Sequence, residues 1–405
     1  MSVEATLVVL FSVATAVAIG ARRLRIPYTA ALVVVGLGLS ALHAVEPPHL
    51  TKEVLFAFIL PGLLFEAAYN LDLAELRRTW WGITALAVPG VVVAIALTAW
   101  ITSATIGALG IDPRFTMGLA LVFGALISAT DPVAVVALFK QLRAPARLAT
   151  LLEAESLLND GTAIVFLTLI LSFVSGASTA PGAIAWHLLT MTGGGILTGA
   201  TIGFAASQIT KRVDDPMIEI TLTVIAAYGS FVLSDQLGVS GVLATVSSGM
   251  ICGSYGKRIG MSDATKVAIH AFWEYLSFAL NSIVFLLIGF EVAYGNLAAA
   301  WREVGIAYVA ALVSRAAVIA AVTMLLRRSV ERIPAGWSVV LTWGGLRGAL
   351  SMVLALGLAP DFVGGELLVT MTFGVVLISL VVQGLSMPWL LRRLRISDKG
   401  VSTGR

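Results

Sequence analysis

The chain has little charge and almost no cysteine. Only 12% of its 405 residues are Asp, Glu, Lys or Arg, whereas 58% are hydrophobic and the mean hydropathy is +0.96. Soluble domains carry about a quarter of their residues as charges. The single cysteine, Cys252, excludes an internal disulfide and a cysteine metal cluster, and the four histidines lack ligand spacing. These shortages exclude an ordinary soluble domain and favour a membrane-embedded body.

The chain also lacks a polar stretch long enough for a second domain. Windows of about 20 residues, the length that crosses a bilayer, identify thirteen candidate helices. We therefore expect an all-α polytopic membrane protein with one transmembrane domain over 1–395 and a short cytoplasmic tail over 396–405. The predicted helices begin near Val3, Pro27, Glu53, Trp81, Phe115, Thr150, Ile184, Pro216, Val239, Lys266, Arg302, Gly336 and Glu366.

Lysine and arginine are scarce on one side of the predicted membrane. Of the 26 Lys and Arg residues, 21 fall in one set of alternate loops and the tail, and only Lys52, Arg114 and Arg302 fall in the other set. Short loops rich in Lys and Arg face the cytoplasm. We expect a multi-pass protein of the cell inner (plasma) membrane, with its N-terminus outside and its C-terminus cytoplasmic. This topology explains the basic residues, so they do not indicate nucleic-acid binding.

An odd number of spans fits two inverted six-helix repeats on either side of a linker helix, an arrangement found in many transporters. We place repeat 1 at about 1–175, the linker helix at about 184–209 and repeat 2 at about 216–393. This division pairs the fifth span with the twelfth. Both contain helix-breaking residues, SATDPVAVV at 128–136 and TWGGLRGALSM at 342–352. Interrupted segments in corresponding positions of two halves point to a binding site.

Pro132 and Asp131 explain how the fifth span would open. Proline lacks an N–H and disfavours helix at the residue before it. We predict that spans 5 and 12 are discontinuous and cross in the membrane, which leaves partial charges at the exposed helix ends. Asp131 would balance the positive N-terminal ends and Arg347 the negative C-terminal ends. A plain proline kink and a glycine packing face are the alternative interpretation.

The sixth span holds the strongest polar signal, LLEAESLLNDGTAIVF at 151–166. Its Glu155 and Asn159, and its Ser156 and Asp160, are spaced i, i+4 and form two neighbouring stripes. Ionisable groups at membrane depth cost at least about 2.5 to 3.5 kcal/mol on insertion scales, so several within one turn indicate a polar site. The converging charges are Glu66, Asp131, Glu155, Asp160, Arg315 and Arg347. Structural ion pairs could explain each one alone, but together they favour an ion path.

These segments resemble those of the monovalent cation/proton antiporters, specifically the branch of prokaryotic sodium/proton antiporters related to animal sodium/proton exchangers. The resemblance covers nearly the whole chain, and it implies a transporter without a cofactor, not an enzyme. The motifs that carry it occur in the expected order and are LPGLLFEAAYNLD, SATDPVAVVALFK, EAESLLNDGTAIVF, the arginine of LVSRAAVIA and WGGLRGALSM.

The resemblance implies that Asp160 is the carboxylate that binds either a cation or a proton. Ser156, Glu66 and the backbone carbonyl of Thr130 would assist it, and Asp131 would belong to the crossed-helix site. A hard cation such as Na+ suits carboxylate, hydroxyl and carbonyl oxygens. One carrier carboxylate would exchange one sodium ion for one proton without moving net charge.

The resemblance also implies supporting roles. Glu155 would pair with Arg315 and hold Asn159, while Arg347 would stabilise the unwound twelfth span. A homodimer is implied, with one bundle moving against the other. Three alternatives stay open. Potassium could replace sodium, a cation channel would use a similar polar path without occlusion, and an intramembrane aspartyl protease would need a shared-proton dyad.

Overall fold

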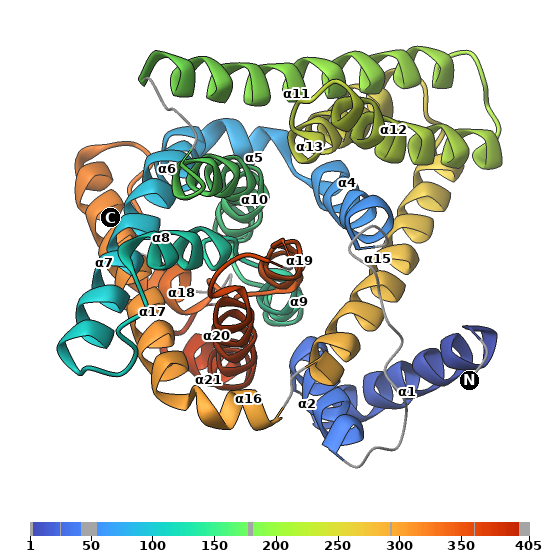
Figure 1. The fold of residues 1–405 in the computed structure, drawn as a ribbon. Helices are drawn as coiled ribbons and strands as arrows, with labels where there is room; N and C mark the ends of the chain where they lie inside the picture. Colours follow the sequence, from blue (N-terminus) through green and yellow to red (C-terminus); the bar gives the residue numbers. More distant parts are fainter. Residues whose placement is uncertain are drawn as a thin grey trace. The chain divides into compact units, whose positions relative to one another are not determined.

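The computed structural model describes residues 3–24, 26–41, 55–176, 181–291, 294–359 and 361–396. The regular secondary structure of these residues is entirely helical, without a β-strand (Figure 1). The start of the third predicted span, near Glu53, and the tail after residue 396 lie outside the described residues. Seven described helices are long and apolar enough to cross a membrane. They are Trp80–Ala108, Ala146–Val174, Gly182–Thr210, Pro216–Gln236, Asp263–Phe290, Trp301–Arg328 and Gly365–Arg393.

The chain divides into two compact units, which are described separately. The first comprises Met1–His49, Arg77–Ile170 and Ser282–Arg405. The second comprises Leu50–Leu76 and Leu171–Asn281.

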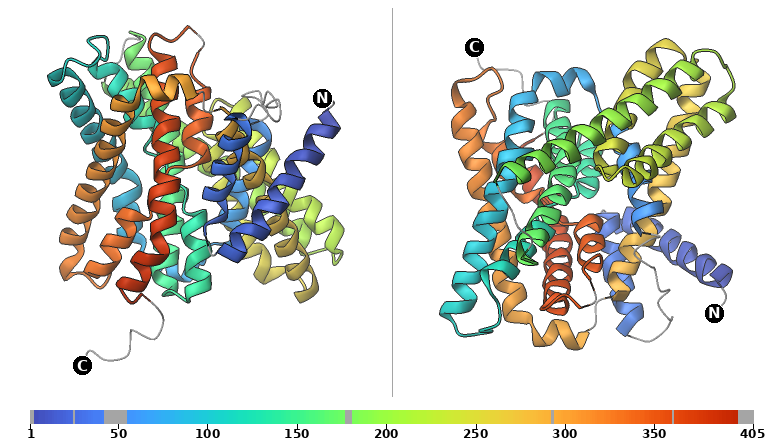
Figure 2. Two further views of the ribbon diagram at one scale, coloured as in Figure 1. Left: turned by 90° about the horizontal axis from the view of Figure 1, so that it is seen from below. Right: turned by 45° about the horizontal axis from the view of Figure 1, so that its top comes forward.

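The first unit is built around α17, which packs against α7 and α20. The views in Figure 2 show α17 and α20 running side by side. Each helix satisfies its backbone hydrogen bonds internally. Leucine, valine and alanine dominate because their apolar side chains can face lipid or one another. The elements of this unit are α1 (Val3–Leu24), α2 (Tyr28–Ala41), α6 (Trp80–Ala85), η2 (Leu86–Gly90), α7 (Val91–Ala108), α8 (Met117–Leu126), α9 (Val133–Leu142), most of α10 (Ala146–Val174), α16 (Tyr294–Ala299), α17 (Trp301–Leu325), η4 (Leu326–Arg328), α18 (Ala335–Trp343), α19 (Ala349–Leu356), α20 (Gly365–Ile378), η5 (Ser379–Gly384) and α21 (Leu385–Arg393).

The fifth and twelfth predicted spans are both interrupted, as the sequence predicts. Residues 127–132 separate α8 from α9, and residues 344–348 separate α18 from α19. Pro132 occupies the cap position before α9, where its missing N–H costs no helical bond. Gly344 and Gly348 flank the second interruption on either side, next to α18 and α19. Each span therefore consists of two half-helices.

The second unit packs α13 against α4, α11 and α12. Small residues bring the helix backbones together. A side chain added at Gly199 or Gly203 of α11 would meet the backbone of α13 at Ala244 or Ser248, so the two helices approach closely at these glycines. The elements are η1 (Leu55–Ile59), α4 (Leu60–Asn70), α11 (Pro181–Thr210), α12 (Pro216–Gln236), α13 (Gly241–Ile251), η3 (Cys252–Gly256), α14 (Lys257–Ile259) and most of α15 (Asp263–Glu291); the short α5 (Leu73–Arg78) extends from this unit to the first residues of the other.

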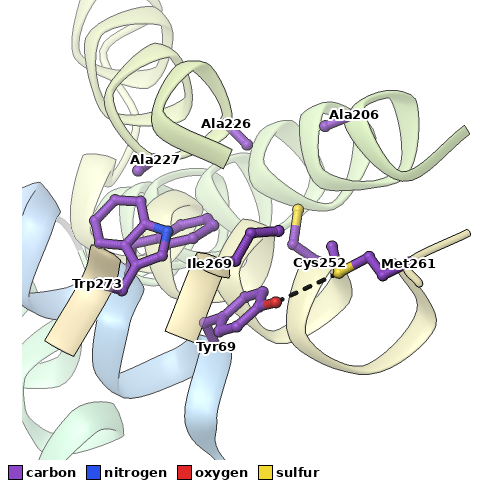
Figure 3. Packing of buried hydrophobic residues seen from close by; sticks show 9 residues of the cluster. Tyr69, Ala206, Ala226, Ala227, Cys252, Met261, Ile269 and Trp273 are labelled. Atoms are coloured by element: carbon purple, nitrogen blue, oxygen red, sulfur yellow. Dashed lines mark hydrogen bonds between the residues drawn. The ribbon is translucent and has the colours of Figure 1, made fainter. Parts of the chain in front are cut away.

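A buried apolar cluster fills the centre of the second unit (Figure 3). The rings of Phe65 and Trp273 lie 4.7 Å apart between centroids. The indole N–H of Trp273 donates to Thr223 Oγ1 at 2.9 Å, and the Tyr69 hydroxyl donates to Met261 Sδ at 3.4 Å. The polar ends of these aromatic side chains are satisfied within the cluster, so it is a packing core.

Candidate functional site

The two helix interruptions in the first unit lie side by side. The backbone N–H of Asp131 donates to the carbonyl oxygen of Leu346 at 2.8 Å, which joins one unwound segment to the other. The guanidinium group of Arg347 donates through Nη1 to the carbonyl oxygens of Ser128 at 2.9 Å and Ala129 at 3.3 Å. These carbonyls follow the C-terminal end of α8, where the helix dipole is negative. Arg347 therefore places a positive charge against the exposed carbonyls of the opposite segment.

Asp131 lies at two helix N-termini. Its Oδ1 accepts a hydrogen bond from the N–H of Val133 at 3.0 Å, in the first turn of α9, and its carboxylate also faces the N–H of Ala349, in the first turn of α19. Negative charge is favourable at helix N-termini. The approach to α19 requires a glycine, because a Cβ at Gly348 would collide with the Asp131 carboxylate. Asp131 of the first interruption thus faces the N-terminus of α19, and Arg347 of the second faces the carbonyls after α8.

One face of α10 carries a closed ion pair. Glu155 and Arg315 of α17 are 2% and 8% exposed, and their carboxylate and guanidinium groups make two hydrogen bonds, at 2.9 and 3.1 Å. Arg315 Nε donates to the carbonyl oxygen of Leu341 at 3.0 Å. Gly345 leaves room for this guanidinium, since a Cβ there would overlap it. The predicted pair between Glu155 and Arg315 is present.

Asn159 extends this face toward the first interruption. Its amide Nδ2 donates to the carbonyl oxygen of Ser128 at 3.0 Å and to Glu155 Oε1 at 3.3 Å. The Ser128 carbonyl is therefore shared between Asn159 and Arg347. The amide connects the buried ion pair to the unwound segment.

The neighbouring face of α10 carries Asp160 and Ser156. The Ser156 hydroxyl donates to the carbonyl oxygen of Thr130, and the backbone N–H of Thr130 faces the Asp160 carboxylate. Asp160 Oδ1 is buried and has no hydrogen-bond partner among the described residues. The carboxyl groups of Asp131 and Glu155 lie close enough to act on it electrostatically. This face offers carboxylate, hydroxyl and carbonyl oxygens, the ligand types that a hard cation prefers.

Glu66 lies on α4, in the second unit. It is half-buried, and its Oε1 accepts a hydrogen bond from Asn70 Nδ2 at 2.8 Å. Because the other predicted site residues belong to the first unit, the assistance of Glu66 at the ion site stays a prediction.

Sequence reasoning missed two residues that contact the second interruption. Ser379 and Gln383 of η5 bond to the backbone at Arg347 and Trp343. Their signal was available, because they are polar side chains four residues apart in the otherwise apolar stretch 373–385. The described residues contain no cluster of three or more His, Cys, Asp or Glu that could hold a metal ion.

Buried charges on facing half-helices, within an all-helical multi-span protein, define a membrane transporter of the broken-helix class. The chain matches the family described as "Sodium/hydrogen exchanger, transmembrane" over residues 8–393. It therefore belongs to the sodium/hydrogen exchanger family, whose members are transporters and not enzymes.

The similar proteins agree with this assignment. The low-affinity Na(+)/H(+) antiporter NhaS1 of Synechocystis is 37% identical over 376 residues, which cover 91% of this chain and 70% of the relative. The Na(+)/H(+) antiporter NhaP of Pseudomonas aeruginosa is 37% identical over 350 residues, 85% of this chain and 81% of the relative. The solved sodium proton antiporter MjNhaP1 of Methanocaldococcus jannaschii superimposes with a TM-score of 0.79 at 19% identity, covering 96% and 98% of the two chains, and so has the same fold.

Proposed function

We propose that this chain exchanges one sodium ion for one proton at the Asp160 carboxylate, by alternating access. Na+/H+ antiport of the NhaP type follows from the family to which the chain belongs. One observation carries the choice of Asp160. Its buried Oδ1 has no hydrogen-bond partner among the described residues, whereas Glu155, five residues earlier, is closed by Arg315.

Asp160 binds the cation together with the Ser156 hydroxyl and the Thr130 carbonyl, which are already in contact with each other. Asp131 assists from the first interruption, and Glu66 is the fourth proposed contributor. A sodium ion and a proton compete for the same carboxylate oxygens, so binding of one displaces the other.

The remaining site residues hold the geometry. Arg347 neutralises the carbonyl ends at Ser128 and Ala129, and Asp131 neutralises the N-termini of α9 and α19. Pro132 keeps the first interruption open. Glu155, Arg315 and Asn159 form a bonded set beside the carrier, in which the charges of Glu155 and Arg315 offset each other.

The stoichiometry follows from this division of roles. Asp160 carries either Na+ or H+, and the two loaded forms have the same net charge. Asn159 is an amide and cannot take up a second proton. Each turn of the cycle therefore moves one positive charge inward and one outward, and exchange is electroneutral.

The proposed architecture has thirteen spans in two inverted six-helix repeats, about 1–175 and 216–393, with a linker helix at about 184–209 and spans 5 and 12 crossing at the site. The two interruptions support this symmetry. They are joined by a backbone hydrogen bond, Arg347 of one contacts the carbonyls of the other, and Asp131 contacts helix N-termini. The strong Lys and Arg asymmetry of the loops supports an outside N-terminus, a cytoplasmic C-terminus and a place in the cell inner membrane. We propose a homodimer as the working assembly.

Proton flux in liposomes tests the proposal. Purified protein is reconstituted with an internal pH dye, and a potassium gradient with valinomycin sets the membrane potential. The sodium ratio that stops net proton flux should be the same at every potential. If a second proton moved in each cycle, one net charge would cross the membrane. A potential of about 100 mV would then contribute about 2.3 kcal/mol and shift that ratio by about 50-fold.

Two controls complete the test. Potassium and valinomycin without sodium should give no protein-dependent proton flux, which establishes that potassium is not exchanged. Sodium currents far above the turnover of a carrier would indicate a channel and contradict alternating access.

A further inference from the structure

The last span contains a π-helical turn at its centre. The helix runs from Gly365 to Arg393, with α20 and α21 on either side of η5 (Ser379–Gly384). Single π-turns inside α-helices occur frequently at functional sites. Ser379 and Gln383 of this turn are 1% and 3% exposed, so their polar groups require partners within the protein.

Both partners are backbone groups at the second interruption, one within it and one at the last residue of α18. The Ser379 hydroxyl oxygen accepts from the backbone N–H of Arg347 at 3.1 Å, and Gln383 Nε2 donates to the carbonyl oxygen of Trp343 at 3.3 Å. One bond therefore holds the residue just before the unwound residues 344–348, and the other holds a residue near the end of that segment. The Ser379 hydroxyl donates its own proton to the carbonyl oxygen of Val376 at 2.9 Å, which fixes its orientation.

Arg347 connects this contact to the ion site. Its backbone N–H is held by Ser379, and its guanidinium group bonds to the carbonyl of Ser128. The Ser128 carbonyl also accepts from Asn159, the residue before Asp160. A continuous series of hydrogen bonds thus runs from the π-turn to the side of α10 that carries the proposed carrier.

The packing beside the unwound segment is incomplete. A cavity of about 10 Å³, close to the volume that one water molecule needs, borders the segment and the π-turn. Its lining is mainly polar and includes Tyr308, Arg315, Thr342, Arg347, Ser379 and Gln383. Loss of either bond would therefore remove one restraint on the segment next to this space.

We infer that Ser379 and Gln383 are positioning residues for sodium/proton exchange. They fix the unwound segment so that Arg347 stays against the α8 carbonyls and the cation oxygens keep their spacing. This inference rests on the proposed function of the site. It assigns a role to the π-turn of the last span, which does not itself contact the proposed carrier.

The test compares sodium affinity with turnover in liposomes for Ser379→Ala, Ser379→Thr and Gln383→Met. Ser379→Ala leaves the buried Arg347 N–H without its acceptor, and we expect the KM for Na+ to rise by about tenfold. Gln383→Met, which keeps the side-chain length, should raise it by about threefold to tenfold. Ser379→Thr retains the hydroxyl and should restore a KM close to that of the unmodified chain.

Thr370→Ala provides the matched control, because Thr370 lies on α20 and its hydroxyl bonds to the carbonyl of Glu366 in the same helix. It should leave KM unchanged. If Ser379→Ala does not fold, Gln383→Met and Ser379→Thr decide the question. Folded Ser379→Ala or Gln383→Met protein with an unchanged KM and reduced turnover alone would overturn the positioning role. Failure of the unmodified chain to exchange sodium for protons would overturn the proposed function and this inference together.

Discussion

The two faces of α10 carry the same chemical group in opposite situations. On one face, both oxygens of Glu155 accept hydrogen bonds from Arg315, and Asn159 adds a third. On the other face, Asp160 Oδ1 is buried without a hydrogen bond among the described residues, and the neighbouring carboxyl groups repel its charge. A carboxylate that is closed by an arginine keeps its charge, whereas one without a fixed cation can exchange a mobile cation for a proton. The presence or absence of a paired arginine, more than the choice of Asp or Glu, decides which of the two carboxylates can be a carrier.

Glycines determine where those partners can go. Gly345 clears the path by which Arg315 reaches Glu155, and Gly348 lets the Asp131 carboxylate approach the N-terminus of α19. In both places a Cβ would overlap a charged side chain. The second interruption therefore distributes charges around α10 as well as unwinding a span.

The largest expected effect comes from neutralising Asp160. Asp160→Asn keeps the shape of the side chain but cannot bind a proton or balance a sodium ion, so sodium-driven proton flux should fall to that of empty liposomes. The variant should still insert and fold, because the substitution removes an unpaired buried charge. Flux from a pH dye and a detergent melting curve give the two readouts.

Asp235→Asn is the matched control, since Asp235 is an exposed carboxylate at the end of α12. It should exchange like the unmodified chain. Normal exchange rates in Asp160→Asn would remove Asp160 from the carrier role and erase the functional difference between the two faces.

The next largest effect is on stability and concerns the ion pair between Glu155 and Arg315. Glu155→Gln or Arg315→Gln leaves one uncompensated buried charge, which typically costs about 3 to 5 kcal/mol. The double variant removes both charges and should regain much of that loss. Thermal melts in detergent of the three variants measure the coupling. Simple additivity of the two single losses would contradict a direct pair.

An exposed ion pair in the same chain serves as the reference. Lys266 and Asp263 lie 3.0 Å apart with the Asp263 side chain 99% exposed, and exposed pairs contribute little to stability. Asp263→Asn should leave the melting temperature unchanged. The contrast isolates burial as the cause of the larger effect.

The sequence predicts an all-helical, multi-span membrane protein and both interruptions, because a backbone in lipid must satisfy its hydrogen bonds internally. Long apolar runs have few alternatives to membrane helices, and Pro132 and the glycines around Arg347 break helices by local rules. The pairing of Glu155 with Arg315 came from the family resemblance, since their spacing of 160 residues carries no local signal.

Other features were beyond local reasoning. The π-turns, such as η5, have no recognised sequence pattern, and the short helices α5 and α16 are too small for span-length windows. The contact of Ser379 with Arg347 joins two elements 32 residues apart through one hydroxyl. Such contacts depend on which helices are neighbours and how each is rotated. Helices that are apolar on every side carry little sequence information about either.

The smallest expected effect concerns a third buried carboxylate, Glu331, which pairs with a helix end and not with an arginine. Its two oxygens accept from the backbone N–H groups of Trp81 at 3.3 Å and Gly82 at 2.8 Å, in the first turn of α6. Thr79, at the cap position, makes no capping bond with its own side chain. Glu331→Ala should therefore destabilise the protein by about 1 to 2 kcal/mol, and Glu331→Gln, which keeps one acceptor, by less. Because no hydrogen bond among the described residues joins Glu331 to the polar side chains on either face of α10, the KM for Na+ should not change in either variant. A KM shift as large as that expected for Ser379→Ala would show that Glu331 acts on the ion site, and that a carboxylate bound to a helix end can influence exchange.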